Sequence, residues 1–406
     1  MDDGSGNFRI AKRRSTLWFG FVASSTKFCS SFHATHFTPR FQKAVTETKA
    51  ERHARGFRCW DQFVAMLFCQ LGRAQSLREI CGGLASCEGR LAHLGAKVPG
   101  RSTLAYANAH RPAALFEKVF YQLLDQCQSV AWPRKFRFKN KLMSLDSTLI
   151  EVCEDIFKWA KYQQTKGAIK LHFTLDHEGY LPTVMVMTDG NTGDGGIARQ
   201  WGFSAGTILV FDRGYRDTSW YRKLTETGVF FVTRLLANAV LEVVESHPVP
   251  KNRRIVSDET VRFTGKKTRD KYPDHLRRVV VDLGDGKTLA RLTNSFHLGA
   301  STIAAIYKDR WQIELFFKAL KQNLRIKTFV GTSANALKIQ IWTALIAILL
   351  LKYLKMKARF GWSLSNLVAL LRMNLFVYRD LWDWVNNPFI APPLESLPEQ
   401  MNFSFS

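Results

Sequence analysis

The stretch TILVFDRGY, residues 207–215, is an apolar run that ends abruptly at a charged residue, Asp212. The apolar residues before the aspartate predict a buried strand. The segment DTSWYRKLTETG (217–228) then has the pattern of a helix that ends at Gly228, and VFFVTRL (229–235) predicts another strand. Strands that alternate with helices in this way are typical of α/β sheets.

Further strands precede this unit. The segment KLMSLDSTLI (141–150) has strand character, and AIKLHFTLDHEGYLPTVMVMT (168–188) predicts two strands joined by a hairpin at residues 176–179. The segment GGIARQWGF (195–203) predicts a short helix before the strand that ends at Asp212. The whole order, β-β-β-α-β-α-β, predicts an α/β fold with a mixed sheet and helices on both of its faces.

The rest of the chain divides into further regions. Residues 236–300 are β-rich around a basic loop, GKKTRDK (265–271), and interrupt the α/β pattern before a helix resumes at residue 301. The apolar run IWTALIAILLL (341–351) is shorter than the about 20 residues that span a bilayer, so it predicts a buried helix and no membrane partner. We therefore expect a loose extension (1–36), a helical domain (37–132), the first part of the core (133–235), a β-rich insertion (236–300), and the last core helix with C-terminal helices (301–406).

Charge indicates the class of partner. The 406 residues include 58 Lys and Arg against 34 Asp and Glu, which gives a formal net charge of +24. This charge is spread over several segments, so it favours nucleic acid as the partner over an anionic lipid surface or mere solubility. Seven Cys, an odd number without a Cys-x-x-Cys pair, predict reduced thiols in a cytoplasmic protein rather than disulfides or a zinc site.

The helical region contains a candidate element for contacting DNA. The segment RSTLAYANAHR (101–111) predicts a short polar helix capped by Ser102, with Arg101 before it and Arg111 at its end. Short helices that end in a basic one resemble a helix-turn-helix module. We expect Arg101, Ser102 and Arg111 to contact DNA. The alternative is an α-helical bundle without any role in nucleic-acid binding.

The segment YKDRWQIELFFKALKQNLR (307–325) predicts an amphipathic helix with a carboxylate among its apolar residues. Four polar residues fall within about 60° of one another and form one stripe about 21 Å long: Tyr307, Arg310, Glu314 and Lys321. The apolar residues expected to pack are Leu315, Phe316, Leu320 and Leu324. The stripe is either a surface ion pair, which stabilises little, or a charged site that binds a polyanion around a metal ligand.

Two further carboxylates lie in strands. Asp146 lies inside the apolar strand SLDST and Asp212 ends ILVFDRG, where a buried charge is costly unless it has a partner. Ligands of open α/β sheets collect at such strand ends, to which Glu314 returns on its helix. Three convergent carboxylates without His or Cys are hard oxygen ligands suited to Mg²⁺ or Mn²⁺. Two such ions would support phosphoryl transfer, with Arg310 and Lys321 holding the phosphates.

Other polar residues near these motifs have simpler explanations. Asp176 and Glu178 are expected to belong to the hairpin turn. His172 and His177 are expected to be structural or solvated rather than catalytic, because the spacing typical of a His-type metal hydrolase is absent. Asp194, a predicted helix N-cap, is the reserve candidate for a metal ligand.

These motifs together resemble the ribonuclease-H-like catalytic core of DDE transposases. The segment Tyr307-x-x-Arg310-x-x-x-Glu314-x-x-x-x-x-x-Lys321 is similar to the Y-R-E-K signature of the fourth insertion-sequence family of bacterial transposases. The segments FDRGY (211–215) and GAIKLHFTLDHEGYLP (167–182) resemble the same family. The resemblance extends from about residue 37 to the C-terminus.

The resemblance implies a transposase that cuts DNA at transposon ends and joins the 3′ ends to target DNA. It implies that Asp146, Asp212 and Glu314 are catalytic and bind two Mg²⁺ or Mn²⁺ ions, while the other three signature residues contact the DNA backbone. It also implies that the helical region recognises the terminal inverted repeats. The protein would act in the bacterial cytoplasm and as at least a homodimer on DNA.

Two points stay open at the level of sequence. Members that cut DNA through a hairpin stack a flipped base on a Trp of the β insertion. No Trp lies between Trp220 and Trp311 here, which leaves Phe263 or Tyr272 for that role.

The alternative functions are a metal-dependent nuclease without strand transfer and a catalytically inactive protein that binds inverted repeats. The three intact carboxylates argue against the inactive protein, whereas the residues alone do not separate nuclease from transposase.

Overall fold

The computed structural model describes residues 38–390, apart from short segments within that range. The residues inside the range that it does not describe are 53, 88–90, 92–94, 134, 153–160, 164–165, 237, 252–253, 324–328 and 376–379. The expectation of a loose extension over 1–36 therefore lies outside the described residues, as does the expected packing of Leu324.

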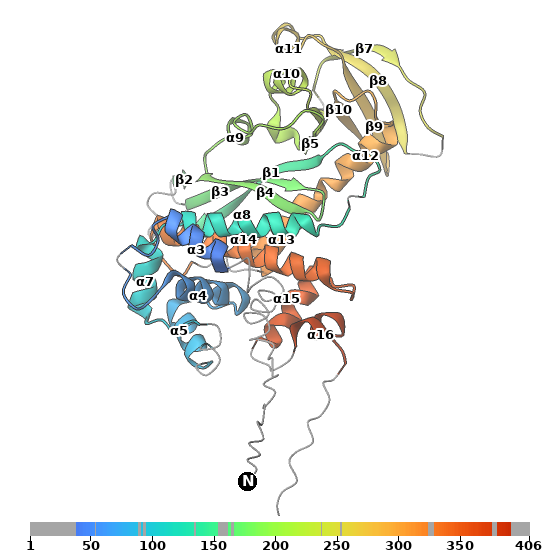
Figure 1. The fold of residues 1–406 in the computed structure, drawn as a ribbon. Coiled ribbons are helices and arrows are strands. Elements are labelled where there is room, and N and C mark those ends of the chain that lie inside the picture. The colour runs from blue at the N-terminus through green and yellow to red at the C-terminus, as the bar shows by residue number, and fades with distance from the viewer. Residues whose placement is uncertain are drawn as a thin grey trace, which may run out of the picture.

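One mixed sheet of ten strands forms the centre of the described part of the chain (Figure 1). The strands are β1 (Leu142–Val152), β2 (Lys161–Gln163), β3 (Lys166–Asp176), β4 (Leu181–Asp189), β5 (Ile208–Phe211), β6 (Phe230–Arg234), β7 (Leu241–Ser246), β8 (Ile255–Phe263), β9 (Leu276–Gly284) and β10 (Lys287–Thr293). Their order is β2-β3-β1-β5-β6-β10-β9-β8-β7, with β4 paired to β3. The pairs β1–β5 and β5–β6 are parallel and the others antiparallel, so the predicted mixed sheet is confirmed.

The hairpin predicted between the second and third strands is also confirmed. β3 ends at Asp176 and pairs antiparallel with β4. The Asp176 carboxylate accepts the backbone N–H of Glu178 at 2.9 Å, which is the local contact expected of an Asp that starts a turn.

The β insertion extends the same sheet. β10 returns to pair with β6, and β9, β8 and β7 follow outward from it, as expected for a β-rich segment. The segment 265–271, predicted as a loop, instead contains helix α11 (Lys266–Lys271). The physical reason is composition, because four of the six residues of α11 are Lys or Arg, which are good helix formers.

The two faces of the sheet pack in different cores, because successive side chains of a strand point to opposite faces. One face packs on helices α9 (Asp194–Ala198) and α10 (Thr218–Glu226) through residues such as Leu145, Phe211 and Trp220. The other face packs on α12 (Ala300–Asp309) through Leu142, Ile208, Val210, Ile303 and Ile306. The even-numbered residues of β1 and β5 that join this cluster therefore face α12.

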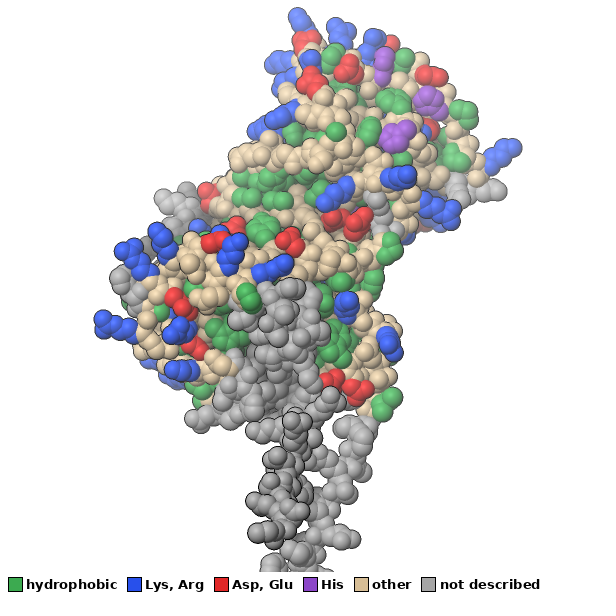
Figure 2. Space-filling view, viewed as in Figure 1, with side chains coloured by type: hydrophobic (Ala, Val, Ile, Leu, Met, Phe, Trp, Pro, Cys, Tyr) green, Lys and Arg blue, Asp and Glu red, His purple; other side chains and the backbone are tan. Residues whose placement is uncertain are grey.

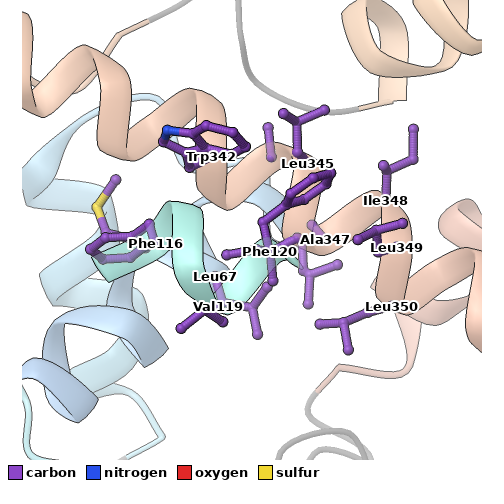
Figure 3. Close-up of a cluster of buried hydrophobic side chains, with 14 of the residues drawn as sticks. Leu67, Phe116, Val119, Phe120, Trp342, Leu345, Ala347, Ile348, Leu349 and Leu350 are labelled. Carbon is purple, nitrogen blue, oxygen red and sulfur yellow. The ribbon is translucent and has the colours of Figure 1, made fainter. Parts of the chain in front are cut away.

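Helices from both halves of the chain form a layer next to β1–β4 (Figure 1). They are α3 (Thr38–Glu47), α4 (Cys59–Leu71), α5 (Leu77–Ala85), α7 (Arg101–His110), α8 (Ala114–Ser129), α13 (Trp311–Asn323), α14 (Ala334–Lys357), α15 (Leu364–Met373) and α16 (Leu381–Asn386). α14 packs against α8, where Trp342 meets Phe120 with ring centroids 5.2 Å apart (Figure 3). The predicted helical region thus shares one hydrophobic core with the C-terminal helices.

α14 contains the apolar run that was predicted to be a buried helix. By length and composition alone, α14 could cross a membrane, with a mean hydropathy of 1.8 over its most apolar window. However, 83% of that window is buried inside the protein, as in the core helix of a globular protein. The prediction of a buried helix is therefore confirmed.

The helix expected to resume at residue 301 and to continue through the amphipathic segment 307–325 is divided into two helices in the described residues. α12 ends at Asp309 and α13 begins at Trp311, so the predicted stripe is interrupted at Arg310. The two helices pack in different clusters, α12 on the strands around β5 and β6, and α13 on β3 and α14. No Pro or Gly marks the break in the sequence, so it follows from tertiary packing rather than from local propensity.

The packing of α13 corrects a detail of the predicted pattern. Phe316 and Leu320 are buried as expected, whereas Leu315 is 44% exposed and Phe317 is buried in its place. The Phe316 and Phe317 ring centroids lie 5.2 and 5.7 Å from that of Phe173 on β3. The inward face of α13 is therefore rotated from the one expected for a continuous helix.

Basic side chains are distributed over the molecule rather than gathered in one tail. Lys and Arg appear on the visible face over both the helical layer and the β insertion (Figure 2). This distribution agrees with the spread of charge along the sequence and offers an extended surface to a polyanion.

Candidate active site at the carboxyl ends of the central strands

Asp146 and Asp212 occupy neighbouring positions on parallel strands. The register of β1 and β5 ends with Leu145 opposite Phe211, where β5 also ends. The next residues in that register are the two aspartates, on strands roughly 4.8 Å apart. Both lie at even positions, so both side chains are on the face that α12 covers.

The turn after β5 holds the Asp212 carboxylate. Asp212 caps the short 3₁₀ helix η3 (Arg213–Tyr215), and its Oδ1 accepts the N–H of Gly214 at 2.7 Å. A Cβ atom on residue 214 would lie 2.9 Å from that oxygen, closer than real contacts allow. A larger residue at position 214 would therefore displace the Asp212 carboxylate from its hydrogen bond to the turn.

Arg310 joins Glu314 to Asp146. It lies at the break between α12 and α13, where its Nη1 donates to Asp146 Oδ2 at 3.0 Å and its Nη2 donates to Glu314 Oε1 at 3.2 Å. Glu314 is in the first turn of α13, where the helix dipole favours a carboxylate. The expected ion pair between Arg310 and Glu314 exists, but Arg310 also pairs with Asp146 on the sheet, so the contact is not confined to the helix surface.

The raised pKa of the Asp146 carboxyl indicates that this site needs additional positive charge. Burial raises the pKa of the Asp146 carboxyl to about 7, and the charges of Asp212 and Glu314 add to the increase, while the Ser147 N–H and Arg310 oppose it. Additional positive charge would favour the ionised form of such a group. The three carboxylates offer only oxygen, the donor that Mg²⁺ and Mn²⁺ prefer. Their chemistry therefore fits a divalent metal ion.

The side chains do not enclose a ready-made ion position. Within the described residues, no three His, Cys, Asp or Glu side chains are grouped so that they would hold a metal ion. At this site the guanidinium of Arg310 lies between Asp146 and Glu314 and supplies positive charge to both.

The remaining signature residues lie on opposite sides of the helix break. Tyr307 belongs to α12, and its ring centroid is 5.3 Å from the guanidinium carbon of Arg291 and 5.8 Å from that of Arg310. Lys321 is in the last turn of α13 and half-buried, about two turns beyond Glu314. The structure thus groups Tyr307 and Arg310 with the aspartates and places Lys321 further along.

A buried chain of hydrogen bonds that the sequence did not predict supports the helix break. Ser144 Oγ lies 2.7 Å from His177 Nε2, and His177 Nδ1 lies 2.7 Å from Asp309 Oδ2. Tyr180 donates its hydroxyl to the same Asp309 oxygen at 3.2 Å. Ser144 is fully buried, so this arrangement is no hydrolytic triad. It ties β1 to the end of α12, which agrees with the structural role expected for His177.

Replacing His177 tests the strength of this connection. His177→Ala is expected to lower the free energy of unfolding by about 3 kcal/mol, because it leaves the buried Ser144 hydroxyl and Asp309 carboxylate without their partner. Urea unfolding followed by tryptophan fluorescence measures the loss. The control is His247→Ala, which removes a hydrogen bond of 2.8 Å to Thr260 from a more exposed ring and should cost less than about 1 kcal/mol. Equal losses in both variants would contradict the role given to His177.

Asp194 has partners within the protein. It is the first residue of α9, whose N-cap is Gly193 rather than the predicted Asp194. Its Oδ1 lies 2.9 Å from Lys170 Nζ and 3.2 Å from His172 Nδ1. Although burial raises its pKa, hydrogen bonds from His172, Lys170 and Ser147 lower it to about 2. The carboxylate is thus already neutralised by neighbours.

A cavity of about 680 Å³ opens between η3, α10, β6 and the insertion. Its basic lining residues are Arg199, Arg216, Arg234 and Lys271. Of the two aromatic residues considered for base stacking, Phe263 borders this cavity. Tyr272 is fully buried with its hydroxyl 3.0 Å from Thr225 Oγ1, so its ring is not available.

The residues predicted to contact DNA in the helical region divide into two groups. α7 begins at Arg101 with Gly100 as its N-cap, so Ser102 lies inside the first turn instead of capping the helix. Arg101 and Ser102 are exposed. The guanidinium of Arg111 donates to the Phe57 carbonyl and lies over the Phe57 ring. Arg111 therefore anchors the end of α7, while the start of the helix remains open to a partner.

Comparison with known proteins identifies the family. The family model described as the transposase DDE domain matches residues 137–350, a range that includes Asp146, Asp212 and Glu314. The chain belongs to the DDE transposase family. In the helical region of this transposase, a model for a domain of unknown function, DUF4372, matches residues 37–97.

Relatives with curated names are transposases as well. The chain is 33% identical over 338 residues to y4zB of Sinorhizobium fredii, named as a transposase, covering 80% of this chain and 93% of y4zB. It is 30% identical over 255 residues to a transposase named for insertion sequence element IS5377 of Geobacillus stearothermophilus, covering 62% of this chain and 67% of the relative. Among solved structures, a piggyBac transposase synaptic complex with hairpin DNA has a TM-score of 0.45 and 11% identity, covering 97% of this chain and 86% of that chain.

The prediction from the motifs is confirmed at the level of family, fold class and reaction. The protein is an enzyme of DNA transposition that acts on DNA, and its family uses divalent metal ions.

Proposed function

We propose that Asp146, Asp212 and Glu314 form the catalytic site of this transposase and bind two ions of Mg²⁺ or Mn²⁺. The placement of Asp146 and Asp212 side by side on parallel strands is the observation that carries the proposal, with Glu314 joined to Asp146 through Arg310. Divalent ions held by carboxylates activate an attacking oxygen and stabilise a leaving oxygen in phosphoryl transfer.

Arg310 has two roles in this proposal. In the free protein, its guanidinium neutralises Asp146 and Glu314 and so holds α13 against β1. A planar guanidinium is also well suited to phosphate, which DNA presents to the same carboxylates. Arg310 therefore both organises the site and contacts the DNA backbone.

Tyr307 and Lys321 contact the DNA backbone on either side of Glu314. Burial raises the pKa of the Tyr307 hydroxyl, although Arg310 opposes the increase, so the hydroxyl stays protonated and donates to a phosphate oxygen. Lys321, about two turns along α13, adds a cation for a neighbouring phosphate. Together they align the strand with the three carboxylates.

The remaining parts of the proposal concern the complex with DNA. The helical region recognises the terminal inverted repeats. Arg101 and Ser102 at the exposed start of α7 contact DNA, while Arg111 holds the end of that helix in place through Phe57. Two transposon ends must be brought together, so the protein acts as a homodimer on DNA. It works in the bacterial cytoplasm and has no membrane partner.

The test is a reconstituted reaction. The purified full-length protein is incubated with labelled DNA ends carrying the element's own inverted repeats, a supercoiled target plasmid, and Mg²⁺, Mn²⁺ or EDTA. We expect cleaved 3′ ends and joined products with either metal and neither in EDTA. Cleavage without joining would indicate a nuclease, and binding without cleavage would indicate an inactive repeat-binding protein.

A further inference from the structure

We propose that Arg234 and Arg291 form a second phosphate-binding site for the DNA strand, next to the catalytic carboxylates and outside the Y-R-E-K signature. This inference rests on the proposed function of the carboxylate site. It assigns a ligand, a DNA phosphodiester, to two basic residues that no sequence motif singles out.

Strand register places four charged residues in one row across the sheet. The pairing of β5 with β6 ends with Phe211 opposite Thr233, so the next residues in register are Asp212 and Arg234. The pairing of β6 with β10 places Arg291 directly opposite Arg234. Since Asp146 is next to Asp212, the row across β1, β5, β6 and β10 is two acids followed by two arginines. At about 4.8 Å per strand it covers about 14 Å.

The row lies on the face of the sheet that carries the catalytic residues. Val232 packs in the cluster of α12, so Arg234, two residues later on β6, is on the same face. The guanidinium of Arg291 lies over the ring of Tyr307, the signature residue of α12. Thr233 donates its hydroxyl to the Asp212 carbonyl at 3.3 Å, which ties β6 to the turn that holds this carboxylate.

Arg291 is a buried cation that no carboxylate neutralises within the described part of the chain. Arg291 is only 4% exposed. Among the described residues its Nε has no hydrogen-bond partner, and its Nη1 donates to the Leu289 carbonyl at 3.2 Å. Burial of an unpaired guanidinium is costly, and like charges directly opposite on neighbouring strands repel. Placing Arg234 and Arg291 next to each other therefore lowers the stability of the free protein.

Three other arginines, all of the insertion, show the contrast. Arg262, Arg277 and Arg278 each pair with a carboxylate at 2.6 or 2.7 Å. Among the described residues, neither Arg234 nor Arg291 makes such a pair. Three arginines of the insertion are thus neutralised by carboxylates, whereas, within the described chain, Arg234 and Arg291 in the row with Asp212 are not. A DNA strand bound at the catalytic site presents phosphates along its backbone, and one of them supplies the missing anion.

The test compares three variants with wild type. Arg291→Met and Arg234→Gln remove the two proposed contacts, and Arg262→Gln, in an exposed pair with Glu242 on the same insertion, is the matched control. Binding to a labelled transposon end is measured by fluorescence anisotropy without metal at several salt concentrations. We expect each of the first two variants to bind about tenfold more weakly at about 0.1 M salt, with a salt slope smaller by about 0.9. Arg262→Gln should match wild type.

Thermal unfolding separates a ligand site from a structural one. Without DNA, Arg291→Met should have a Tm no lower than wild type, because it removes a buried charge that lacks a counterion. If Arg291→Met melts earlier, Arg234→Gln decides, because Arg234 is exposed. Unchanged affinity and salt slope in Arg234→Gln would overturn the proposal.

Two further measurements distinguish related explanations. Inorganic phosphate alone should raise the Tm of wild type more than that of Arg291→Met, and DNA should do so at much lower concentration. Stabilisation by inorganic phosphate with no effect of either variant on DNA binding would refute a DNA site. Cleavage by wild type with Mg²⁺ tests the proposed function separately, so a failure of the arginine site leaves that result intact.

Discussion

Asp146→Asn is expected to abolish metal-dependent cleavage of transposon ends while leaving the free protein at least as stable as wild type. Asparagine keeps the shape of the side chain and removes its charge, so a ligand of the metal ions is lost. Even residues that only orient metal ligands contribute about 10–100-fold, and a direct ligand should contribute more than about 100-fold. DNA binding should change little, because the signature and arginine contacts remain.

The stability part of this prediction follows from the surroundings of Asp146. Its side chain is 18% exposed, and the charges of Asp212 and Glu314 act on it. Burial first and these charges second disfavour its ionised form in the folded protein. A neutral amide relieves this cost, while Arg310 keeps Glu314 as a partner. Such a gain of stability with loss of activity is characteristic of residues kept for function.

Cleavage of labelled ends and thermal unfolding at pH 8 without metal provide the two readouts. Asp125→Asn, at an exposed carboxylate on α8, is the control and should change neither. A folded Asp146→Asn protein that cleaves at the wild-type rate would remove Asp146 from the catalytic set. A large loss of Tm would instead show that its carboxylate serves mainly to hold Arg310.

Much of the core could be predicted because its signals are local. Strand periodicity around Asp146 and Asp212 locates both strands, and a charge at the end of an apolar run marks each as a candidate ligand. The parallel register that brings them together also requires the order of the strands, which the helix between β5 and β6 makes predictable.

Features that depend on long-range contacts could not be predicted. The break at Arg310 carries no Pro or Gly, and it arises because Asp309 and Arg310 are held by partners on the sheet side of the helix. The pairing of Arg234 with Arg291 depends on β10 returning to β6 after the whole insertion. No pattern within β6 or β10 alone predicts that the two strands are neighbours. For the same reason the bond of His177 to Ser144 was not foreseen from two residues far apart in the chain.

Glu314→Gln is expected to abolish cleavage by more than about 100-fold and to change stability by at most about 0.5 kcal/mol. This substitution can separate two roles of one carboxylate, because Glu314 is both an ion-pair partner of Arg310, at 3.2 Å, and a candidate metal ligand. Its side chain is 38% exposed, so the ion pair is screened by solvent and contributes little to the fold. A large effect on activity would therefore reflect a role of the carboxylate in the reaction rather than a loss of the fold.

The chain offers a matched control for the ion pair. Arg222 and Glu226 on α10 form another pair four residues apart, at 2.7 Å, with both side chains exposed. Glu226→Gln should lower stability by a similar small amount and leave cleavage unchanged. The comparison thus separates loss of a helix-surface pair from loss of a metal ligand.

Calcium binding provides a readout that is independent of turnover, because Ca²⁺ is also a hard ion that prefers oxygen ligands. Wild type and Glu226→Gln should gain thermal stability with Ca²⁺, whereas Glu314→Gln should gain markedly less. Wild-type cleavage by Glu314→Gln would make the Glu314–Arg310 pair an ordinary helix contact. Lost cleavage with an undiminished gain from Ca²⁺ would place Glu314 in DNA alignment instead. Only the combined loss of cleavage and of metal-dependent stabilisation, at nearly constant stability without metal, makes Glu314 the third ligand beside Asp146 and Asp212.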